Sequence, residues 1–185
     1  MTSLTRLRVH LWTTGACVDA LSLPVLRFLH VEGTWNPPRV QHLLHKCAHI
    51  RKFVFSSITA DCTQGQLPRV LAHLTNLASL ELAGLRMTRG DFIPLSSPDP
   101  ATGTWIAPEL EKIIIKPTSM DRDAASSCID FVRSRTAEDA GPTGGRKRLR
   151  VARVRMRPAG DLDWLQSVLS SMCEGEGQET AEDTS

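Results

Sequence analysis

The side chains best suited to chemistry in this 185-residue chain are three histidines and a cysteine that fall within eight consecutive residues. They are His42, His45, Cys47 and His49, and imidazole and thiolate groups are ligands that zinc often takes in proteins. A zinc site needs these groups to converge tetrahedrally on one point. Cys47 lies on the apolar stripe of a predicted helix, whereas His42 and His45 lie off that stripe, so their side chains diverge from the thiol. We therefore interpret the cluster as a core cysteine with surface histidines, and we predict no metal and no cofactor.

A second group of chemically capable residues is the basic run Arg146-Lys147-Arg148-Leu149-Arg150, which continues as Arg153, Arg155 and Arg157. Runs of this kind are typical of nuclear-localisation signals and nucleic-acid-binding patches. The later arginines alternate with apolar residues, as the outer face of a half-exposed strand does. We favour the solvated strand face. A nucleic-acid-binding or nuclear accessory protein, acting through this basic C-terminal strand, is the alternative function.

The chain contains the residue types that nucleophilic catalysis uses, but no motif brings them together. A serine or cysteine nucleophile needs a base within hydrogen-bond reach. The sequence contains neither a nucleophile elbow nor a phosphate-binding loop after a strand. The glycine-rich stretch 141–145 follows a predicted helix and has the wrong spacing for such a loop. We therefore expect a protein that is not an enzyme.

These residues are positioned by a unit that the sequence contains twice, 27 residues apart. Seven apolar positions recur: Val40, Leu43, Leu44, Cys47, Ile50, Phe53 and Phe55 correspond to Leu67, Val70, Leu71, Leu74, Leu77, Leu80 and Leu82. The first four positions have the i, i+3, i+4, i+7 spacing of an amphipathic helix, and the last three have an LxxLxL pattern that ends as a strand does. The repeat predicts helices at 39–47 and 66–74, followed by strands at 50–55 and 77–82.

Four more segments carry the strand pattern, namely 4–11, 26–31, 110–115 and 151–156, and Leu149 offers an alternative start for the last one. Helices that lead into strands at a period in the leucine-rich range indicate a stacked solenoid. We predict an α/β fold: a leucine-rich-repeat-like solenoid of about six short parallel strands with helices on the convex face. The alternative is an ordinary α/β domain in which two units are similar by coincidence.

One domain should span residues 1–172, with a turn-rich insertion at 89–108 that lacks a full helix and a flexible loop at 136–148. We expect a helix capped by Asp121 between them, and a closing helix at 161–172. Residues 173–185 contain five acids and no base, so we predict a disordered acidic tail. Removing those five acids from the net charge of +2 leaves a body of +7, which favours acidic partners.

Composition bears on the location of the protein more than on its function. A hydrophobic share of 41% and a charged share of 23% are ordinary for a soluble globular domain, and no apolar run is long enough to cross a membrane. The five cysteines are dispersed without a CxxC pair, and the N-terminus lacks the pattern of a secretory signal. These features predict reduced thiols and a cytoplasmic or nuclear location.

Several segments resemble one family of repeat proteins. Leu43–Phe55 resembles the LL..C..L..L.L unit of F-box-associated leucine-rich repeats. Leu23–Val31 and Pro108–Ile115 look like the LP.L..L.I strands of the same group. Asp130–Arg135 together with Leu149–Val154 is similar to the C-terminal part of fungal F-box-like (RNI-like) proteins. The resemblance implies the recognition half of a protein that presents a target to a ubiquitin ligase.

Two features depart from that family. The F-box, a helical segment that opens with a Leu-Pro pair, is missing from the sequence. The asparagine ladder of the commonest leucine-rich repeats is replaced by Thr34, Ile58 and Leu85. The first departure implies that this chain by itself is no ubiquitin-ligase adaptor, and the second favours the irregular, longer type of repeat.

The residues between the core positions of each strand form the candidate binding surface, because successive side chains of a strand point to opposite faces. The predicted protein-binding residues are Arg6, Arg8, Phe28, His30, Lys52, Val54, Lys112, Ile114, Lys116, Arg153, Arg155 and Arg157. Phe28, Val54 and Ile114 would be apolar anchors, with positive charge towards both ends of the sheet. We expect a non-catalytic module that binds a protein target with acidic flanks and does not bind membranes. The alternative is a solvated sheet face without a ligand.

Overall fold

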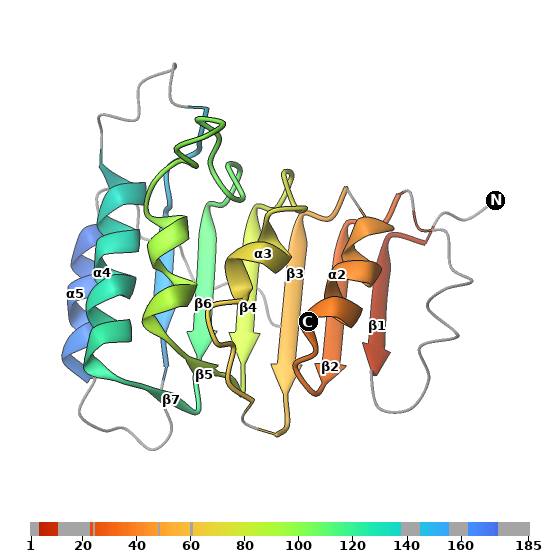
Figure 1. The fold of residues 1–185 in the computed structure, drawn as a ribbon, viewed down its shortest axis with the longest axis horizontal. Helices are drawn as coiled ribbons and strands as arrows, with labels where there is room; N and C mark the ends of the chain where they lie inside the picture. The colour runs from red at the N-terminus through yellow and green to blue at the C-terminus, as the bar shows by residue number, and fades with distance from the viewer. Residues whose placement is uncertain are drawn as a thin grey trace, which may run out of the picture.

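The protein is built on one six-stranded parallel sheet, which the computed structural model shows in the strand order β1-β2-β3-β4-β6-β8 (Figure 1). These strands are β1 (Arg6–His10), β2 (Phe28–Gly33), β3 (Lys52–Ser57), β4 (Ser79–Ala83), β6 (Lys112–Lys116) and β8 (Val151–Val154). The structure describes residues 4–10, 23, 25–47, 49–59, 61–137, 145–155 and 163–173. The predicted α/β class with a parallel sheet is confirmed.

Helices cover one face of this sheet (Figure 1). They are α2 (Pro37–His45), α3 (Leu67–Leu71), α4 (Arg122–Thr136) and α5 (Asp163–Cys173). The last helix, α5, packs against α4 and β8 and closes that end of the sheet, where its Gln166 side chain accepts a hydrogen bond from the backbone N–H of Val154 at 2.7 Å. Among the described residues, no helix lies over the opposite face, and none is long and apolar enough to span a membrane.

Within the six-stranded sheet, every strand after β1 begins in the same way. The carbonyl oxygen of Thr5 accepts hydrogen bonds from the backbone N–H groups of Arg27 and Phe28, at 3.0 and 3.1 Å. The carbonyls that do the same for the next four strands are those of Arg27, Arg51, Ala78 and Glu111. Neighbouring strands are thereby fixed in one register, in which each residue of an LxxLxL unit lies beside the equivalent residue of the next unit.

The core lies between the sheet and the helices. All seven apolar positions of both repeated units are fully buried, as the repeat predicts. Strand residues such as Phe53 and Leu80 face the helices, where they belong to the same cluster as Leu43 and Val70. Burying this apolar surface stabilises the fold by about 25 cal/mol for each Å² removed from water.

Both repeat helices are shorter than the apolar periodicity predicts. α2 ends two residues before Cys47, and α3 has only five residues where the periodicity predicts a helix over 66–74. The chain turns directly afterwards: the N–H of Cys47 donates to the carbonyl of Leu44, and the N–H of Leu74 donates to that of Leu71, both at 2.9 Å. A tight turn therefore places the fourth buried residue of each unit, so periodicity alone overestimates the helix.

The predicted insertion lacks a full helix and contains two short 3₁₀ helices, η1 (Arg89–Asp91) and η2 (Ile93–Leu95). The carboxylate of Asp91 is fully buried. It accepts hydrogen bonds from the N–H and the hydroxyl of Thr88, at 2.8 and 2.9 Å, and from the hydroxyl of Thr63. These bonds hold the insertion against the loop that precedes α3, and they meet the hydrogen-bonding requirement of a buried charge.

A second parallel sheet, formed by two short strands that come soon after β4 and β6 in the chain, was not predicted. It consists of β5 (Arg86–Met87) and β7 (Ser119–Met120). The chain reaches β5 through Gly84, which has a φ of +74°. A Cβ atom on Gly84 would lie 1.9 Å from the carbonyl oxygen of Ser57, so only glycine fits this turn. Strands of two residues have no hydrophobic periodicity, and sequence patterning therefore misses them.

The helix predicted after Asp121 is α4. The side chain of Asp121 caps it by accepting a hydrogen bond from the N–H of Ala124 at 2.7 Å. The predicted loop at 136–148 begins one residue later, since Thr136 is still helical, and residues 145–150, which precede β8, belong to no helix or strand. Residues 138–144 of that loop lie outside the described residues. So does the predicted acidic tail, except for Cys173 at the end of α5.

The side chain of Arg135 in α4 is fully buried, although arginine is rarely a core residue. Its guanidinium donates to the backbone carbonyls of Leu95 and Ala107, at 3.3 and 3.2 Å, and to that of Ile106. Burial, together with the nearby charge of Arg146, lowers the pKa of Arg135 to about 10. Arg135 thus joins α4 to both ends of the insertion.

Of the three core positions predicted for the sixth strand, Val154 is buried as expected, and the other two are not confirmed. Val151 was expected to face the core, which is wrong, and Met156 lies outside the described residues. The buried residues are Leu149, Ala152 and Val154. The N–H groups of Arg150 and Val151 both donate to the carbonyl of Glu111, at 2.8 and 3.1 Å, as at the start of the other strands. Val151 consequently pairs with Lys112 on the face away from the helices.

Candidate interaction face

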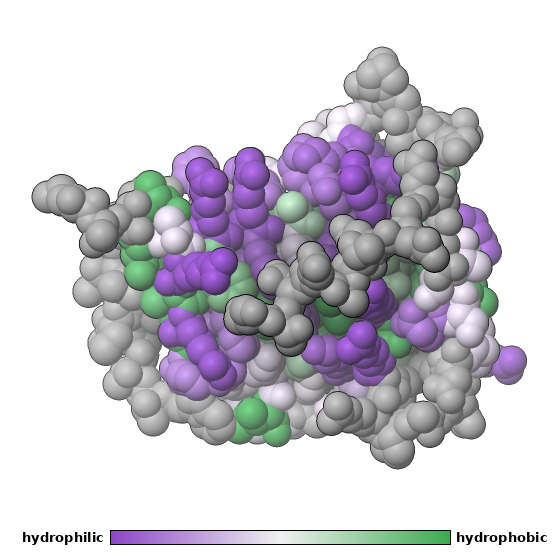
Figure 2. Space-filling view, turned by 180° about the vertical axis from the view of Figure 1, so that it is seen from behind, coloured by the Kyte–Doolittle hydropathy of each residue, from purple (hydrophilic) through white to green (hydrophobic). Residues whose placement is uncertain are grey.

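One face of the sheet carries no described helix. Every second residue of each strand points to this face, and these side chains line up across the strands in three rows. The first row is Arg6, Phe28, Lys52, Ser79, Lys112 and Val151. The second row is Arg8, His30, Val54, Glu81, Ile114 and Arg153. The third row is His10, Glu32, Ser56, Ala83, Lys116 and Arg155. We name these residues the open face, and Figure 2 shows hydrophilic side chains spread across it with hydrophobic ones between.

Eleven of the twelve predicted protein-binding residues lie on the open face, and the twelfth, Arg157, lies outside the described residues. The arrangement differs from the prediction in two respects. Val54, expected to be an exposed anchor, is only 8% exposed. Arg153 pairs with Ile114 in the second row instead of standing beside Lys112 in the first. The second difference arises because the buried positions of the sixth strand unit begin at Leu149, two residues before Val151.

Acidic residues neutralise only part of the positive charge on the open face. Glu81 pairs with Lys116 at 2.5 Å. Glu32 pairs with Arg8 and lies 3.0 Å from the Nδ1 atom of His10. The cations that make no ion pair among the described residues are Arg6, Lys52, Lys112, Arg153 and Arg155. Two of these five stand on β1 and β3, and the other three stand on or next to β6 and β8, so both halves of the sheet carry positive charge.

His30 lies between a hydroxyl and a carboxylate, which are the partners of histidine in a catalytic triad. Its Nε2 atom lies 3.3 Å from Ser56 Oγ and 3.4 Å from Glu32 Oε1. A triad places the nucleophile and the acid on opposite ring nitrogens, whereas here both lie at the same nitrogen. Burial lowers the pKa of His30. Burial would raise the pKa of Glu32, but the hydrogen bond and charge of Arg8 hold it below its ordinary value.

The histidines and the cysteine that crowd together in the sequence are separated by the fold. Cys47 is fully buried, and burial raises its pKa to about 11. His42, His45 and His49 are exposed, and the ring of His45 stacks on that of His73 with centroids 4.0 Å apart. In the part of the chain that the structure describes, no group of three or more His, Cys, Asp or Glu side chains is placed to hold a metal ion.

Two cations of the basic run that precedes β8 make contacts with other parts of the fold. The guanidinium carbon of Arg146 lies 4.3 Å from the centroid of the Trp105 ring. Lys147 pairs with Glu109 and Glu111, at 3.0 and 2.9 Å. Two of the four cations in the run therefore have structural contacts, and the other two are exposed.

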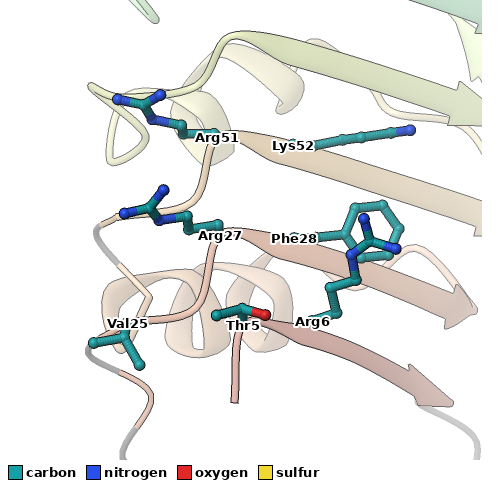
Figure 3. A pocket seen from close by; sticks show the side chains of 7 residues that line it. All are labelled: Thr5, Arg6, Val25, Arg27, Phe28, Arg51 and Lys52. Carbon is teal, nitrogen blue, oxygen red and sulfur yellow. The ribbon is translucent and has the colours of Figure 1, made fainter. Parts of the chain in front are cut away.

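A hollow of about 730 Å³ opens at the edge of the sheet where β1, β2 and β3 begin (Figure 3). Its lining residues are Thr5, Arg6, Val25, Arg27, Phe28, Arg51 and Lys52. Four of the seven are cations and none is an acid, so we name it the basic pocket. Sequence reasoning missed Arg27 and Arg51. The available signal was that both occupy the second position of an LxxLxL unit, just before a strand.

A smaller hollow of about 460 Å³ lies at the opposite ends of the strands. Its lining residues are Ala83, Gly84, Lys116, Pro117, Thr118 and Arg155. Of its two cations, Lys116 is already paired with Glu81. This hollow therefore carries less unmatched charge than the basic pocket.

The fold and the open face define an α/β protein whose parallel sheet has one side packed against helices and one side bearing positive charge that the described residues do not pair. No protein-family model matches the sequence, and no curated protein matches it either.

Proposed function

We propose that this chain is a non-catalytic protein-interaction module that binds a protein target on the open face. The proposal rests on the five cations of that face that make no ion pair among the described residues. Cations left without carboxylates on one surface are complementary to a partner with acidic groups at matching positions. Phe28 and Ile114, both half-buried, stand among these cations as apolar anchors. Charge would steer the encounter, and the anchors would supply much of the affinity.

We further propose that the sheet is a leucine-rich-repeat-like solenoid of the F-box-associated kind. Two observations support this. The strands of the sheet follow one another in chain order, and each is entered through the same pair of hydrogen bonds. Stacked units of this type build extended binding surfaces. The chain would then be the substrate-recognition part of an F-box-like protein.

The test measures the association and dissociation rates of a purified protein partner first identified by capture on the wild-type chain. Lys112→Glu combined with Arg153→Glu should slow association roughly tenfold, because it reverses two steering charges. Phe28→Ala combined with Ile114→Ala should speed dissociation roughly tenfold, because it removes the two apolar anchors that stand among the cations of the face.

The matched control makes the same reversal of charge on the helical side of the sheet. Arg39 in α2 and Arg69 in α3 are both exposed. Arg39→Glu combined with Arg69→Glu should leave both rates unchanged. If this control pair alters binding while the open-face pairs do not, the proposal is wrong.

A nucleic-acid-binding or nuclear accessory protein is the second candidate. Arg150, Arg153 and Arg155 are all exposed at the last strand and favour it. Cations that neutralise phosphates release counterions, so three contacts to a DNA duplex would give a log–log slope of affinity against salt of about −2.7. An oligonucleotide bound with such a slope, and lost in Arg153→Glu with Arg155→Glu, would favour this candidate over a protein target.

A further inference from the structure

The basic pocket shares Arg6, Phe28 and Lys52 with the open face and adds two further arginines beside them. Three of its four cations are arginines, and none of the four makes an ion pair among the described residues. A guanidinium is a planar fork that donates two parallel hydrogen bonds to an oxyanion. One carboxylate would leave most of this charge unmatched. A phosphate monoester carries a charge of about −1.5 to −2 at pH 7 and three acceptor oxygens, which is a closer match.

Figure 3 shows how the cations are arranged. Arg27 and Arg51 come from equivalent positions of adjacent units, lie side by side and point the same way. Adjacent strands are about 4.8 Å apart, so one phosphate group placed between these two side chains is within reach of both. The backbone N–H groups of Arg27 and Arg51 already donate to carbonyls of the preceding unit. Side chains are therefore the donors available to a ligand at this edge.

Apolar surface adjoins these arginines. Val25, which lines the pocket, is 46% exposed, and Leu4, the residue before the pocket's Thr5, is 49% exposed. The Phe28 ring lies on the other side of the pocket, with Lys52 Nζ 5.4 Å from its centroid. A ligand that fits this surface has an apolar group next to its anionic group, as a peptide segment does.

The positive row stops after two strands, which argues against a nucleic acid. The next residues at the second unit position are Ala78 and Glu111, so the edge becomes neutral and then acidic, and positive charge returns only at Arg150 in the last unit, four strands from the start of the row. A nucleic-acid strand carries regularly repeated phosphates and is held by a groove whose cations follow its backbone. The basic pocket offers charge for one phosphate group.

We propose that the basic pocket binds a phosphoserine or phosphothreonine segment of the protein target. The phosphate lies between Arg27 and Arg51, and an apolar side chain of the segment packs against Val25 and Phe28. This inference rests on the proposed function, because the open face begins at the pocket and receives the remainder of the target. Phosphorylation of the target then controls whether it binds.

The test uses an oriented peptide library with a fixed central phosphoserine and an otherwise identical library with serine. The labelled wild-type chain should give roughly tenfold more bound signal on the phosphoserine library. Arg27→Glu combined with Arg51→Glu should abolish that difference. Arg39→Glu combined with Arg69→Glu, the control on the helical side, should preserve it. Circular dichroism should show unchanged folding of both variants, since all four arginines are exposed.

Three outcomes would overturn the inference. One is equal binding of the two libraries. Another is a phosphoserine preference that persists in Arg27→Glu with Arg51→Glu. The third is a single-stranded oligonucleotide that binds more tightly than the phosphoserine library and is lost in the same variant. If phosphoserine preference is absent while Lys112→Glu with Arg153→Glu still slows association of the purified partner, only this inference fails and the proposed function stands.

Discussion

The guanidinium carbon of Arg135 lies 4.7 Å from the centroid of the Trp105 ring, which joins α4 to the insertion between β5 and β6. The same guanidinium donates to three backbone carbonyls of that insertion. A buried charge is costly unless it is fully hydrogen-bonded. Because these partners are carbonyls of a segment without regular strands or long helices, Arg135 organises the segment that satisfies it.

Arg135→Ala should lower the free energy of unfolding by roughly 2–4 kcal/mol, because it leaves buried carbonyls without donors and opens a cavity. Urea denaturation measures this change. Arg133→Ala is the control on the same helix, since the ion pair of Arg133 with Asp130 is mostly exposed and should contribute less than about 1 kcal/mol. Equal destabilisation by the two substitutions would show that the buried contacts are unimportant.

Leu80→Ala should destabilise the protein by roughly 2–5 kcal/mol, because Leu80 is fully buried at the centre of β4. Ser79→Ala changes the neighbouring residue, which points to the open face, and should alter stability by no more than about 0.5 kcal/mol. Chemical denaturation of both variants makes the comparison. A shift within experimental error for Leu80→Ala would mean that the alignment of the repeated units is incorrect.

Gly84→Ala should lower the stability of the protein more than Gly103→Ala does, although both glycines have a positive φ, of +74° and +67°. At Gly103 a Cβ atom would meet nothing within 4 Å, so the cost is the left-handed strain of roughly 1–2 kcal/mol. At Gly84 the backbone must also move away from the carbonyl of Ser57. Thermal melting should show a clearly larger loss for Gly84→Ala, and similar losses would contradict the tight turn.

The stability of the protein should fall on mild acidification. Burial, with the nearby charge of His45, lowers the pKa of His73 below its ordinary value of 6.5. The unfolded chain therefore binds a proton at a higher pH than the folded chain does. Stability falls as the pH drops below about 6.5, and this loss ends below the folded-state pKa. The lowered pKa of His30 acts in the same direction.

His73→Gln should reduce the drop in melting temperature between about pH 7.5 and about pH 5.5, and His30 should account for part of what remains. His49→Gln is the control, because His49 is exposed. If His73→Gln and the wild type show the same pH dependence, His73 is not the source of the loss of stability in acid.

The strands of the sheet were predictable because burial on one side imposes an apolar period of two on each strand. The sixth strand was ambiguous for a specific reason. The spacing of its unit is satisfied from Leu149 through Ala152 and equally from Val151 through Val154, and the apolar pattern does not choose between these frames. The choice is made by backbone hydrogen bonds to Glu111, which leave no mark on the sequence.

The open face was predictable from the same alternation, whereas the basic pocket was not. Arg27 and Arg51 stand outside the strands, so their proximity depends on the turns that bring successive units together. The burial of Arg135 was also beyond sequence reasoning. Its partners are backbone carbonyls 28 to 40 residues away, and a carbonyl acceptor has no residue-type signature.

The carbonyls that start successive strands belong to residues 5, 27, 51, 78 and 111, so the connections lengthen steadily along the chain. The hydrogen bonds at each start are nevertheless the same. The sheet therefore tolerates longer connections between its strands, since doubling the length of a loop costs only about 0.6 kcal/mol of stability. Residues 97–104, which are all exposed and interrupt no strand, are a suitable place to graft a fluorescent reporter or an affinity handle.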